Sequence, residues 1–387
     1  MVKLLIIGQT PPPYVGQMLS IESLITAEYK DIRVYHTRLN YSQTTNQIGK
    51  IRIRKLFHLL RVILESSYKI LRHRIDVIYY PPGADTVPIL RDIATLLVLR
   101  RFGRKLILVF HASGLCERVS SWPEILFWVF KKAFFSPDAA IQKSSLNPPD
   151  GEFIKARAIY TVPNGSPDEF ERFRQRKALN FVPVILFVGL IREDKGVEVL
   201  IEAARLLKAR GQKFRVRLIG EFTSEKYRQK LLREVAKKGL DNCVDFCGRK
   251  VGDEKWAQYR SADIFCFPTY YGSESFGNVL VEAMMFELPV VSTAWRGIPG
   301  IVEEGVTGFL TEVKDPAAVA RQLNRLLDDE KLRMSMGRAG RERYLEEFTV
   351  ETYVEKTRTV VLEVANEKHG PGSIKSRERH RVTAEAR

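Results

Sequence analysis

The sequence has few cysteines and no grouping of them that completes a metal site. Four cysteines are spread over 387 residues, and only Cys243 and Cys247 are close together. Neither a second cysteine pair nor a histidine cluster accompanies them, so the ligands of a zinc shell are missing. We expect buried, reduced thiols, as in proteins of a reducing compartment.

Long hydrophobic runs are also absent. No stretch approaches the about 18–20 consecutive apolar residues that a membrane-spanning helix needs. The apolar run that follows Lys3 stops after four residues, which is too short for a signal peptide. We expect a cytoplasmic protein that does not cross the membrane.

The charges are not balanced. Lysine and arginine number 62 against 46 acidic residues, which gives a net charge of +16. Part of this excess serves solubility, but such a field also attracts nucleic acids, anionic lipids and phosphorylated substrates. No nucleic-acid-binding motif appears, and the basic residues are not interleaved with a stacking platform of aromatic side chains. A nucleic-acid-binding protein is therefore the less favoured alternative, and we expect no nucleic acid partner.

Length and pattern favour two α/β domains. The chain is too long for one ordinary core, and short β-branched runs alternate with longer amphipathic segments, which predicts parallel sheets. In the first half we expect strands at 3–7, 32–36, 77–80, 106–110, 139–141 and 158–161. In the second half we expect strands at 184–188, 215–219, 244–246, 264–267 and 290–292.

A segment rich in proline, asparagine and glycine, 162–167, separates the two halves together with the charged residues after it. We expect two Rossmann-like, doubly wound domains at 1–170 and 178–349. A helix at about 350–365 is expected to pack back on the first domain. The last residues, 367–387, have almost no apolar side chains and are predicted to form a disordered basic tail.

The segment 267–297 contains the most informative residues. A strand is followed by a loop, and a helix begins near Phe276 and Gly277, where unpaired backbone N–H groups suit sugar hydroxyl and phosphate oxygens. Glu274 precedes this helix and Glu282 lies within it. The first carboxylate can accept hydrogen bonds from a sugar, and the second can hold both ribose hydroxyls. Taken alone, each glutamate is better explained as a capping or solvent-facing residue.

Taken together, these residues resemble the signature of the family-four retaining glycosyltransferases, also called glycosyl transferases group 1. The resemblance continues in order through the Pro-Val-Val-Ser, Arg-Gly-Ile-Pro and Glu-Gly-Val-Thr-Gly segments, and covers nearly all of residues 160–350. It implies the GT-B fold, with two domains facing across a cleft. It also implies a sugar-donor site that contains Glu274, Ser275, Phe276, Gly277, Asn278 and Glu282.

A second motif extends from Phe187 to Gly196, as a strand, a glycine turn and a helix start. Cations at such a position bind a diphosphate and stabilise its charge as it leaves. By resemblance, Lys195 is the phosphate-binding lysine. The family usually has an arginine where this chain has Leu190, and Arg192 is the residue expected to replace it, unless one cation suffices. The alternative for Lys195 is an exposed lysine, although a cation is unfavourable at a helix start.

The first domain contributes three residues by resemblance. Gly16 matches the glycine that lets the backbone approach the phosphates of the sugar donor. Gln17 occupies the position of a frequent second glycine, and we expect it to contact donor or acceptor. His111 ends the strand 106–110 and matches a histidine near the transferred sugar, with a purely structural histidine as the alternative.

The resemblance implies a retaining, metal-independent hexosyltransferase that uses a nucleotide-diphosphate sugar and a glycan or lipid-linked acceptor, in envelope polysaccharide or glycolipid synthesis. Glu274, His111 and Lys195 are the expected catalytic residues, and the acceptor site is not identified. The sequence contains no Asp-x-Asp motif, so we expect neither a metal nor another cofactor. A nucleotide-sugar epimerase of the same fold is the alternative.

Residues 52–74 are expected to form a basic amphipathic helix. Leucine and isoleucine dominate one face, and nearly all of the charges are positive. This predicts peripheral contact with an anionic membrane, at its inner face. The alternative is that the apolar face packs on the first sheet. The polar stripe consists of Arg54, His58, Arg61, Glu65, Lys69 and Arg72. The aromatic segment 122–135 is either a second interfacial patch or part of the core.

Overall fold

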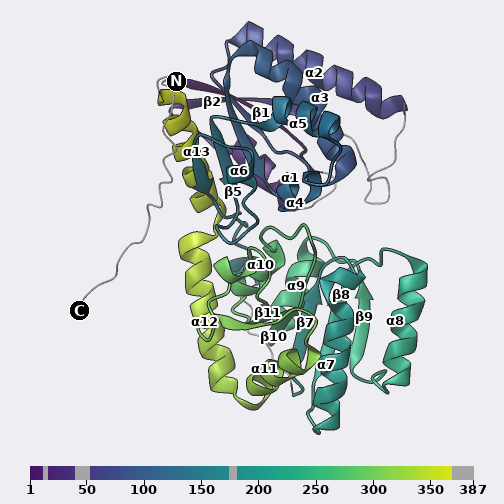
Figure 1. Cartoon of the computed structure of the whole chain (residues 1–387). Helices are drawn as coiled ribbons and strands as arrows, with labels where there is room; N and C mark the ends of the chain where they lie inside the picture. Colours follow the sequence, from purple (N-terminus) through teal and green to yellow (C-terminus); the bar gives the residue numbers. More distant parts are fainter. Residues whose placement is uncertain (12–15, 40–52, 174–180, 368–387) are drawn as a thin grey trace. The chain divides into compact units, whose positions relative to one another are not determined.

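The structure is a computed structural model that describes residues 1–11, 16–39, 53–173 and 181–367 (Figure 1). The chain forms two compact units. Unit 1 comprises Met1–Pro163 together with Tyr353–Arg387, and unit 2 comprises Asn164–Thr352. Unit 1 therefore ends before the expected boundary at residue 170, and the expected tail lies outside the described residues.

Unit 1 is built on a parallel sheet of six strands in the order β2-β1-β3-β4-β5-β6. All six expected strands are present. In sheets of this type, ligands bind at the carboxyl ends of the strands, where the strand order reverses. In unit 1 this point lies between β1 and β3. The strands are β1 (Val2–Gly8), β2 (Ile32–Arg38), β3 (Val77–Tyr80), β4 (Lys105–Phe110), β5 (Ala139–Gln142) and β6 (Ile159–Thr161).

Helices cover both faces of this sheet, because successive strand residues point to opposite faces and both sets are apolar. Leu108 and Phe110 of β4 pack on one side with the helices α2, α3 and α5, whereas Ile107 and Val109 pack on the other side with α1 and α13. The bounds are α1 (Gly16–Thr26), α2 (Ile53–His73), α3 (Thr86–Leu99), α4 (Leu115–Val119), α5 (Glu124–Phe134), α6 (Asp150–Phe153), α13 (Val350–Asn366) and the 3-10 turn η2 (Arg100–Phe102).

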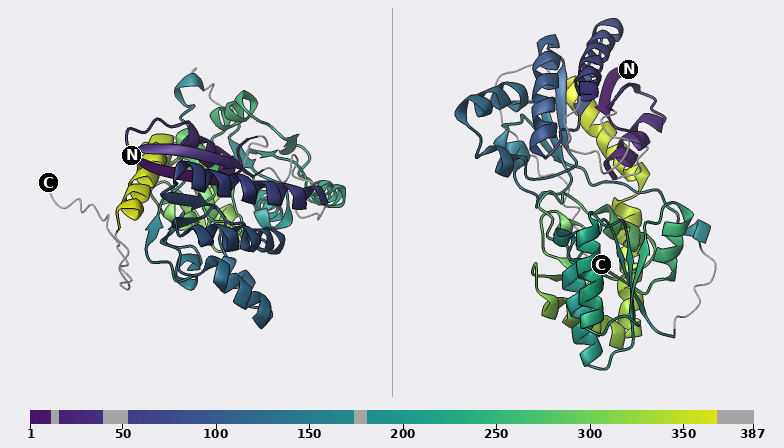
Figure 2. Two further views of the ribbon diagram at one scale, coloured as in Figure 1. Left: turned by 90° about the horizontal axis from the view of Figure 1, so that it is seen from above. Right: turned by 90° about the vertical axis from the view of Figure 1, so that its right-hand side faces the viewer.

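The last helix, α13, belongs to the core of unit 1 although it comes from the far end of the chain (Figure 2). Val360 and Val364 are buried against the first strands. The hydroxyl groups of Tyr353 and Tyr79 lie 3.2 Å apart, and Arg358 Nε donates to Asp31 at 3.0 Å. The sheet of unit 1 is thus covered on one face by a helix that follows unit 2 in sequence.

The helix α2 does not turn its leucine-rich face to the sheet, so the alternative drawn from its periodicity is wrong. Val62, Ser66 and Ile70 form the buried line, while Leu60 and Leu64 are exposed. The polar stripe lies along the flank of the helix, and Lys69 reaches the backbone carbonyl of His36 in β2. The helix is therefore anchored on unit 1 by a narrow line of buried residues.

The aromatic segment 122–135 is mostly core. Phe130 and Phe134 of α5 are buried and stacked with ring centroids 4.5 Å apart. Ile125 and Trp128 lie on the opposite side of the same helix and are exposed. The core interpretation therefore holds for one face of this helix, while its other face is exposed.

Unit 2 contains a second parallel sheet, in the order β12-β11-β10-β7-β8-β9, which is the Rossmann order. The order reverses between β7 and β10. β12 was not among the expected strands. The strands are β7 (Val184–Val188), β8 (Arg215–Ile219), β9 (Val244–Gly248), β10 (Ile264–Phe267), β11 (Val290–Thr293) and β12 (Gly308–Thr311).

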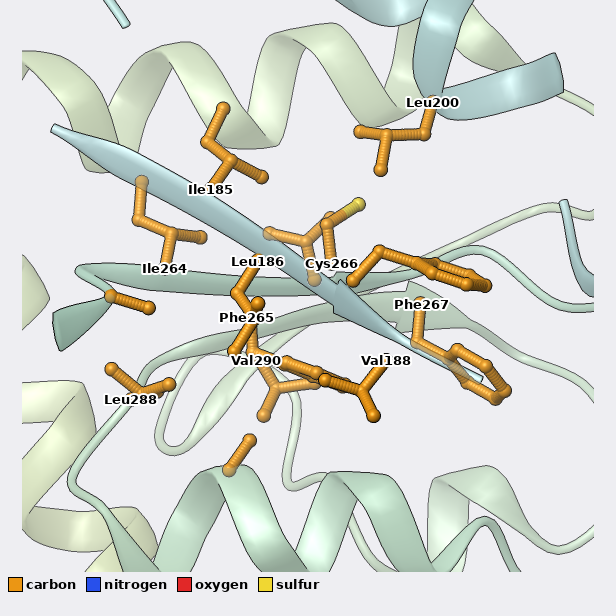
Figure 3. Packing of buried hydrophobic residues seen from close by; sticks show 14 of the residues in the cluster. Ile185, Leu186, Val188, Leu200, Ile264, Phe265, Cys266, Phe267, Leu288 and Val290 are labelled. Atoms are coloured by element: carbon orange, nitrogen blue, oxygen red, sulfur yellow. The ribbon is translucent and has the colours of Figure 1, made fainter. Parts of the chain in front are cut away.

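The two central strands of unit 2 are buried on both faces. Figure 3 shows Ile185 of β7 and Cys266 of β10 on the side of Leu200, and Leu186 and Val188 on the other side. The helices are α7 (Val197–Ala209), α8 (Glu225–Lys237), α9 (Asp253–Ser261), α10 (Asn278–Met285), α11 (Pro316–Asp328) and α12 (Glu330–Glu347), with 3-10 turns η3 (Glu171–Phe173), η4 (Glu193–Lys195) and η5 (Ile298–Gly300).

Candidate functional site

The loops that follow β7 and β10 are held together at the point where the strand order of unit 2 reverses. The backbone N–H of Tyr270 donates to the Asp194 carbonyl at 2.8 Å, and Thr269 Oγ1 donates to the same carbonyl at 3.3 Å. Gly196 has a φ of +76°, and a Cβ there would lie 1.9 Å from the Pro268 carbonyl oxygen. Only glycine permits this approach, which fixes the residue before it, Lys195, against the β10 loop.

Lys195 and Glu274 meet at this junction. Lys195 Nζ lies 2.6 Å from Glu274 Oε2, and both side chains are largely withdrawn from solvent. Lys195 comes from the turn η4 after β7, whereas Glu274 comes from the loop after β10. The two residues expected to bind the phosphates and the sugar are therefore in direct contact. An ammonium and a carboxylate held here offer a donor group and an acceptor group side by side.

Tyr271 lies under both cations of the β7 loop. Lys195 Nζ is 4.4 Å from the centroid of the Tyr271 ring, and the Arg192 guanidinium is 4.8 Å from it. Arg192 also pairs with Asp194 at 2.5 Å. Leu190, where the family usually has arginine, is exposed. Arg192 thus brings its charge to the same ring as Lys195, and the aromatic face orients both cations.

The start of α10 presents backbone N–H groups beside this cluster. Its N-cap is Gly277, with a φ of +88° and no capping side chain. Ser275 and Phe276 are buried, and the Phe276 ring packs on Phe348. Asn278 Oδ1 accepts a hydrogen bond from Asn164 at 3.0 Å. An uncapped helix start of this kind attracts an anion or a hydroxyl oxygen.

Glu282 belongs to a different cluster. Its Oε1 lies 2.7 Å from Lys255 Nζ, and its Oε2 accepts the Tyr259 hydroxyl at 2.7 Å. Lys255 and Tyr259 both come from α9, four residues apart. Burial and the neighbouring carboxylate hold the pKa of the Tyr259 hydroxyl well above its usual value, so this group stays a hydrogen-bond donor. Glu282 is nearly buried and is fixed in orientation before any ligand arrives.

In unit 1, the described part of the glycine loop is the start of α1. This helix begins at Gly16, whose carbonyl accepts the Ser20 hydroxyl at 3.0 Å. Gln17 follows and is partly exposed. The residues just before Gly16 lie outside the described part of the chain.

His111 and Lys143 follow the neighbouring strands β4 and β5 and share one face of the sheet. Burial, and secondly the positive charge of Lys143, hold the pKa of His111 well below its usual value, so its imidazole is neutral at neutral pH. Lys143 is fully buried, and burial lowers its pKa to about 7. Its Nζ lies 4.8 Å from the centroid of the Tyr353 ring.

The loop after His111 is fixed by Asp150. This buried carboxylate accepts the backbone N–H groups of Gly114 at 2.9 Å and Cys116 at 2.8 Å. Burial raises the pKa of Asp150 despite these hydrogen bonds. The position of the histidine loop therefore depends on a residue that no sequence motif marks.

Sequence reasoning missed several residues of these clusters. Lys255 and Tyr259 are spaced as on one helix face but belong to no motif that we considered. Lys143 could have been found from the sequence. It lies two residues after the buried Ile141 and therefore on the same side of the sheet. Tyr271 lies in the segment 267–297 but was not among the predicted site residues.

Comparison with known proteins agrees with these motifs. Residues 169–343 match the sequence profile of the family described as glycosyl transferases group 1. A D-inositol 3-phosphate glycosyltransferase of Corynebacterium efficiens is 37% identical over 183 residues, which cover 46% of this chain and 42% of that protein. A capsular polysaccharide biosynthesis glycosyltransferase, CapM, of Staphylococcus aureus is 29% identical over 211 residues, covering 52% of this chain and 54% of that protein.

The chain thus matches about half the length of these curated relatives. Structural similarity extends further. The crystal structure of HepE from Anabaena in complex with UDP superposes with a TM-score of 0.67 at 19% identity, over 94% of this chain and 100% of that chain. This likeness confirms the expected fold, two Rossmann-like units of the GT-B type. Residues 169–343, which lie in the second unit, are thus similar to the glycosyl transferases of group 1, and both units have the GT-B fold.

Proposed function

We propose that this protein transfers a sugar from a nucleotide-diphosphate donor to a hydroxyl group of an acceptor, with retention of the anomeric configuration. The contact between Lys195 and Glu274 carries the proposal. It joins a cation for the diphosphate and a carboxylate for the sugar, at the place where Rossmann-type sheets bind ligands. The named relatives and the UDP complex of HepE support a nucleotide-sugar donor.

In the proposed reaction, the bond between the anomeric carbon and the β-phosphate oxygen breaks, and its electron pair stays on the phosphate. Lys195, Arg192 and the N–H groups at the start of α10 stabilise that growing charge. The acceptor oxygen bonds to the anomeric carbon on the same face, and its proton passes to a departing phosphate oxygen. Glu274 orients the sugar by accepting from its hydroxyl groups.

The remaining site predictions concern the same reaction. Glu282 is proposed to hold the ribose hydroxyl groups, with Lys255 and Tyr259 keeping its carboxylate in place. Ser275, Phe276, Gly277 and Asn278 are proposed to line the donor site. His111 acts as a neutral hydrogen-bonding group, because its pKa is too low for a proton donor at neutral pH. Gly16 and Gln17 are proposed to contact the donor from unit 1.

No metal ion is required in this proposal, because side-chain cations and a helix dipole supply the positive charge. The reaction rate should then be the same with EDTA as with added Mg²⁺ or Mn²⁺. A rate that falls severalfold with EDTA and recovers with metal would contradict metal independence while leaving sugar transfer intact.

The acceptor is proposed to be a glycan or a lipid-linked glycan of the cell envelope. This proposal rests on the names of the relatives, one of which acts in capsular polysaccharide biosynthesis. We propose that the reaction occurs at the cytoplasmic face of an anionic membrane. The transferase names disfavour the alternative of a nucleotide-sugar epimerase.

The proposal is tested first by binding. A thermal-shift panel of UDP-, GDP-, ADP- and dTDP-sugars should give a clear rise in melting temperature with one nucleotide. Glu282→Ala should abolish this rise, whereas Glu202→Ala, which removes a glutamate ion-paired with Lys238 at 3.1 Å, should retain it. No response to any of the four nucleotides would overturn the proposed function.

Transfer and epimerisation are then separated by product analysis. Incubation with the identified nucleotide sugar alone should give no epimer. With a glycan or polyprenyl-linked acceptor, NMR of the product should show the anomeric configuration of the donor. Inversion of that configuration would contradict the retaining mechanism.

A further inference from the structure

The outward face of α2 is apolar. Leu60, Leu64 and Leu71 are exposed to 53%, 60% and 64%, and Phe57 and Tyr68 are exposed to a similar degree. These residues follow one another at helical spacing, so they form one continuous stripe along the helix. An ordinary surface helix shows the opposite pattern, with polar residues outward. The stripe is therefore a surface that needs a partner.

The apolar surface continues on the two neighbouring helices. In the described part of unit 1, all exposed large apolar side chains other than Met1 and Leu146 lie on α2, α3 or α5. Contacts link α2 to α3 and α3 to α5, and the three helices cover the same face of the sheet. Ile125 and Trp128 of α5 are exposed to 82% and 60%. We call this surface, with Leu56, Phe57, Leu60, Leu64, Tyr68, Leu71, Val87, Leu90, Ile125 and Trp128, the apolar face.

Cations border the apolar face. Arg61 and Arg72 are exposed along one edge of the stripe on α2. Lys131 and Lys132 are exposed on α5, where Lys132 Nζ lies 5.4 Å from the centroid of the Trp128 ring. The one acidic residue of α2, Glu65, is already paired with Lys69 at 2.6 Å. Apolar side chains with a positive border match the interface of an anionic bilayer, where the chains enter the acyl region and the cations meet headgroups.

We infer that the apolar face docks unit 1 onto an anionic lipid surface, with α2 lying in the plane of the interface. The exposed apolar residues of α2 extend from Leu56 to Leu71, so the stripe is about 20 Å long. No helix in the described ranges is long and apolar enough to span a bilayer, and α2 has the mixed composition of an interfacial helix. This inference rests on the proposed function and names the surface through which the protein contacts the membrane.

Trp128 provides a direct probe of depth. In a flotation assay, the full-length protein should rise with vesicles of phosphatidylcholine and phosphatidylglycerol, and binding should fall at least severalfold with phosphatidylcholine alone or at high salt. Phosphatidylcholine brominated in its acyl chains, added to the anionic vesicles, should quench tryptophan fluorescence on binding. Trp128→Phe should remove most of this quenching while leaving flotation largely intact.

The double variant Leu60→Ser, Leu64→Ser should bind anionic vesicles at least tenfold more weakly. Both leucines are exposed, so its melting temperature should match that of the wild type. The control is Leu232→Ser, Leu345→Ser, which changes two exposed leucines of unit 2 and should float normally. Both proteins should keep the thermal shift with the nucleotide sugar.

Three outcomes would overturn the inference: wild-type protein that does not float with anionic vesicles, unchanged flotation of the Leu60/Leu64 variant, or a stable dimer in solution that this variant converts to monomer. The last outcome would identify a second copy of the chain as the partner. If the thermal shift with the nucleotide sugar is retained in any of these cases, the proposed transferase function still holds. Loss of that thermal shift in the wild type would contradict the proposed function and leave the membrane inference unaffected.

Discussion

The hydroxyl group of Tyr259 donates a 2.7 Å hydrogen bond to Glu282, from a helix that no motif connects with the carboxylate. If Glu282 holds the ribose, Tyr259 sets its orientation. Tyr259→Phe should lower the affinity for the nucleotide about tenfold and cost about 1.5–3 kcal/mol of stability, the usual contribution of a hydrogen bond to a charged group. Calorimetric titration with the identified nucleotide measures the first effect, and urea unfolding measures the second.

Tyr344→Phe is the matched control for this experiment. Tyr344 is also buried in unit 2 and donates its hydroxyl to the Ser166 carbonyl at 2.9 Å. The control should lose about 0.5–1.5 kcal/mol of stability, because its acceptor is a neutral carbonyl, and keep full affinity. Equal loss of affinity in both variants would mean that Tyr259 acts only through the stability of unit 2.

Lys195 should matter more for catalysis than for folding. Lys195→Met should reduce kcat by about 100- to 1000-fold, the range found when a group that stabilises transition-state charge is removed. Lys238→Met, which breaks ion pairs with Glu202 and Glu234 at 3.1 Å each, should leave kcat unchanged. Steady-state kinetics with saturating nucleotide sugar compares the two. A kcat for Lys195→Met within threefold of wild type would remove this lysine from the catalytic residues.

Gly196 should be irreplaceable for a reason beyond its backbone angle. Gly196→Ala and Gly211→Ala both place a side chain at positive φ, +76° and +80°, but only at Gly196 does the new Cβ collide with Pro268. Gly211→Ala should cost about 1 kcal/mol. Gly196→Ala should cost several times more and also weaken nucleotide binding, because the β7 and β10 loops must separate. Denaturant unfolding and calorimetric titration of both variants measure these effects, and equal unfolding costs would contradict the collision.

Lys143 should make the stability of unit 1 depend on pH. Its pKa is about 7 in the folded protein and about 10.5 when unfolded. Between these values the unfolded chain binds more protons, so stability rises with pH from 7 to about 10 and loses this contribution as pH falls toward 7.

Lys143→Met should therefore raise the free energy of unfolding at pH 7 by an amount on the order of 3 kcal/mol, and the difference from wild type should shrink as pH approaches 10. Urea unfolding at pH 7, 8.5 and 10 tests this. Lys30→Met, an exposed lysine in the same unit, should show no such trend. A difference for Lys143→Met that does not change with pH would assign the effect to packing.

The strands of both sheets could be predicted because both faces of each sheet are covered, which leaves runs such as 184–188 and 106–110 almost wholly apolar. β12 was missed because its four residues, Gly308–Thr311, are too short and mixed to stand out from the loop around them. For the apolar face of α2, the sequence left two alternatives open, the membrane and the sheet. Periodicity shows that a helix has an apolar face, but it does not show whether that face is inside.

The contact of Lys195 with Glu274 could be anticipated from the sequence, since both follow strands of one parallel sheet and such strand ends lie along one edge. The surroundings of Glu282 could not. Lys255 and Tyr259 reach it from α9, and that approach depends on how α9 packs against α10, which no local pattern encodes. Lys143 was overlooked because a lysine in an apolar strand end is usually exposed.

The placement of α13 has a consequence for biosynthesis. One side of the first sheet is closed by Tyr353, Val360 and Val364, residues that leave the ribosome only after the whole of unit 2 has been made. Until then, the opposing apolar residues of β1 and β3 have only part of their cover, which comes from α1. Unit 2, which is continuous in sequence, can complete its core during translation, so the half of the protein that is synthesised first is expected to mature last.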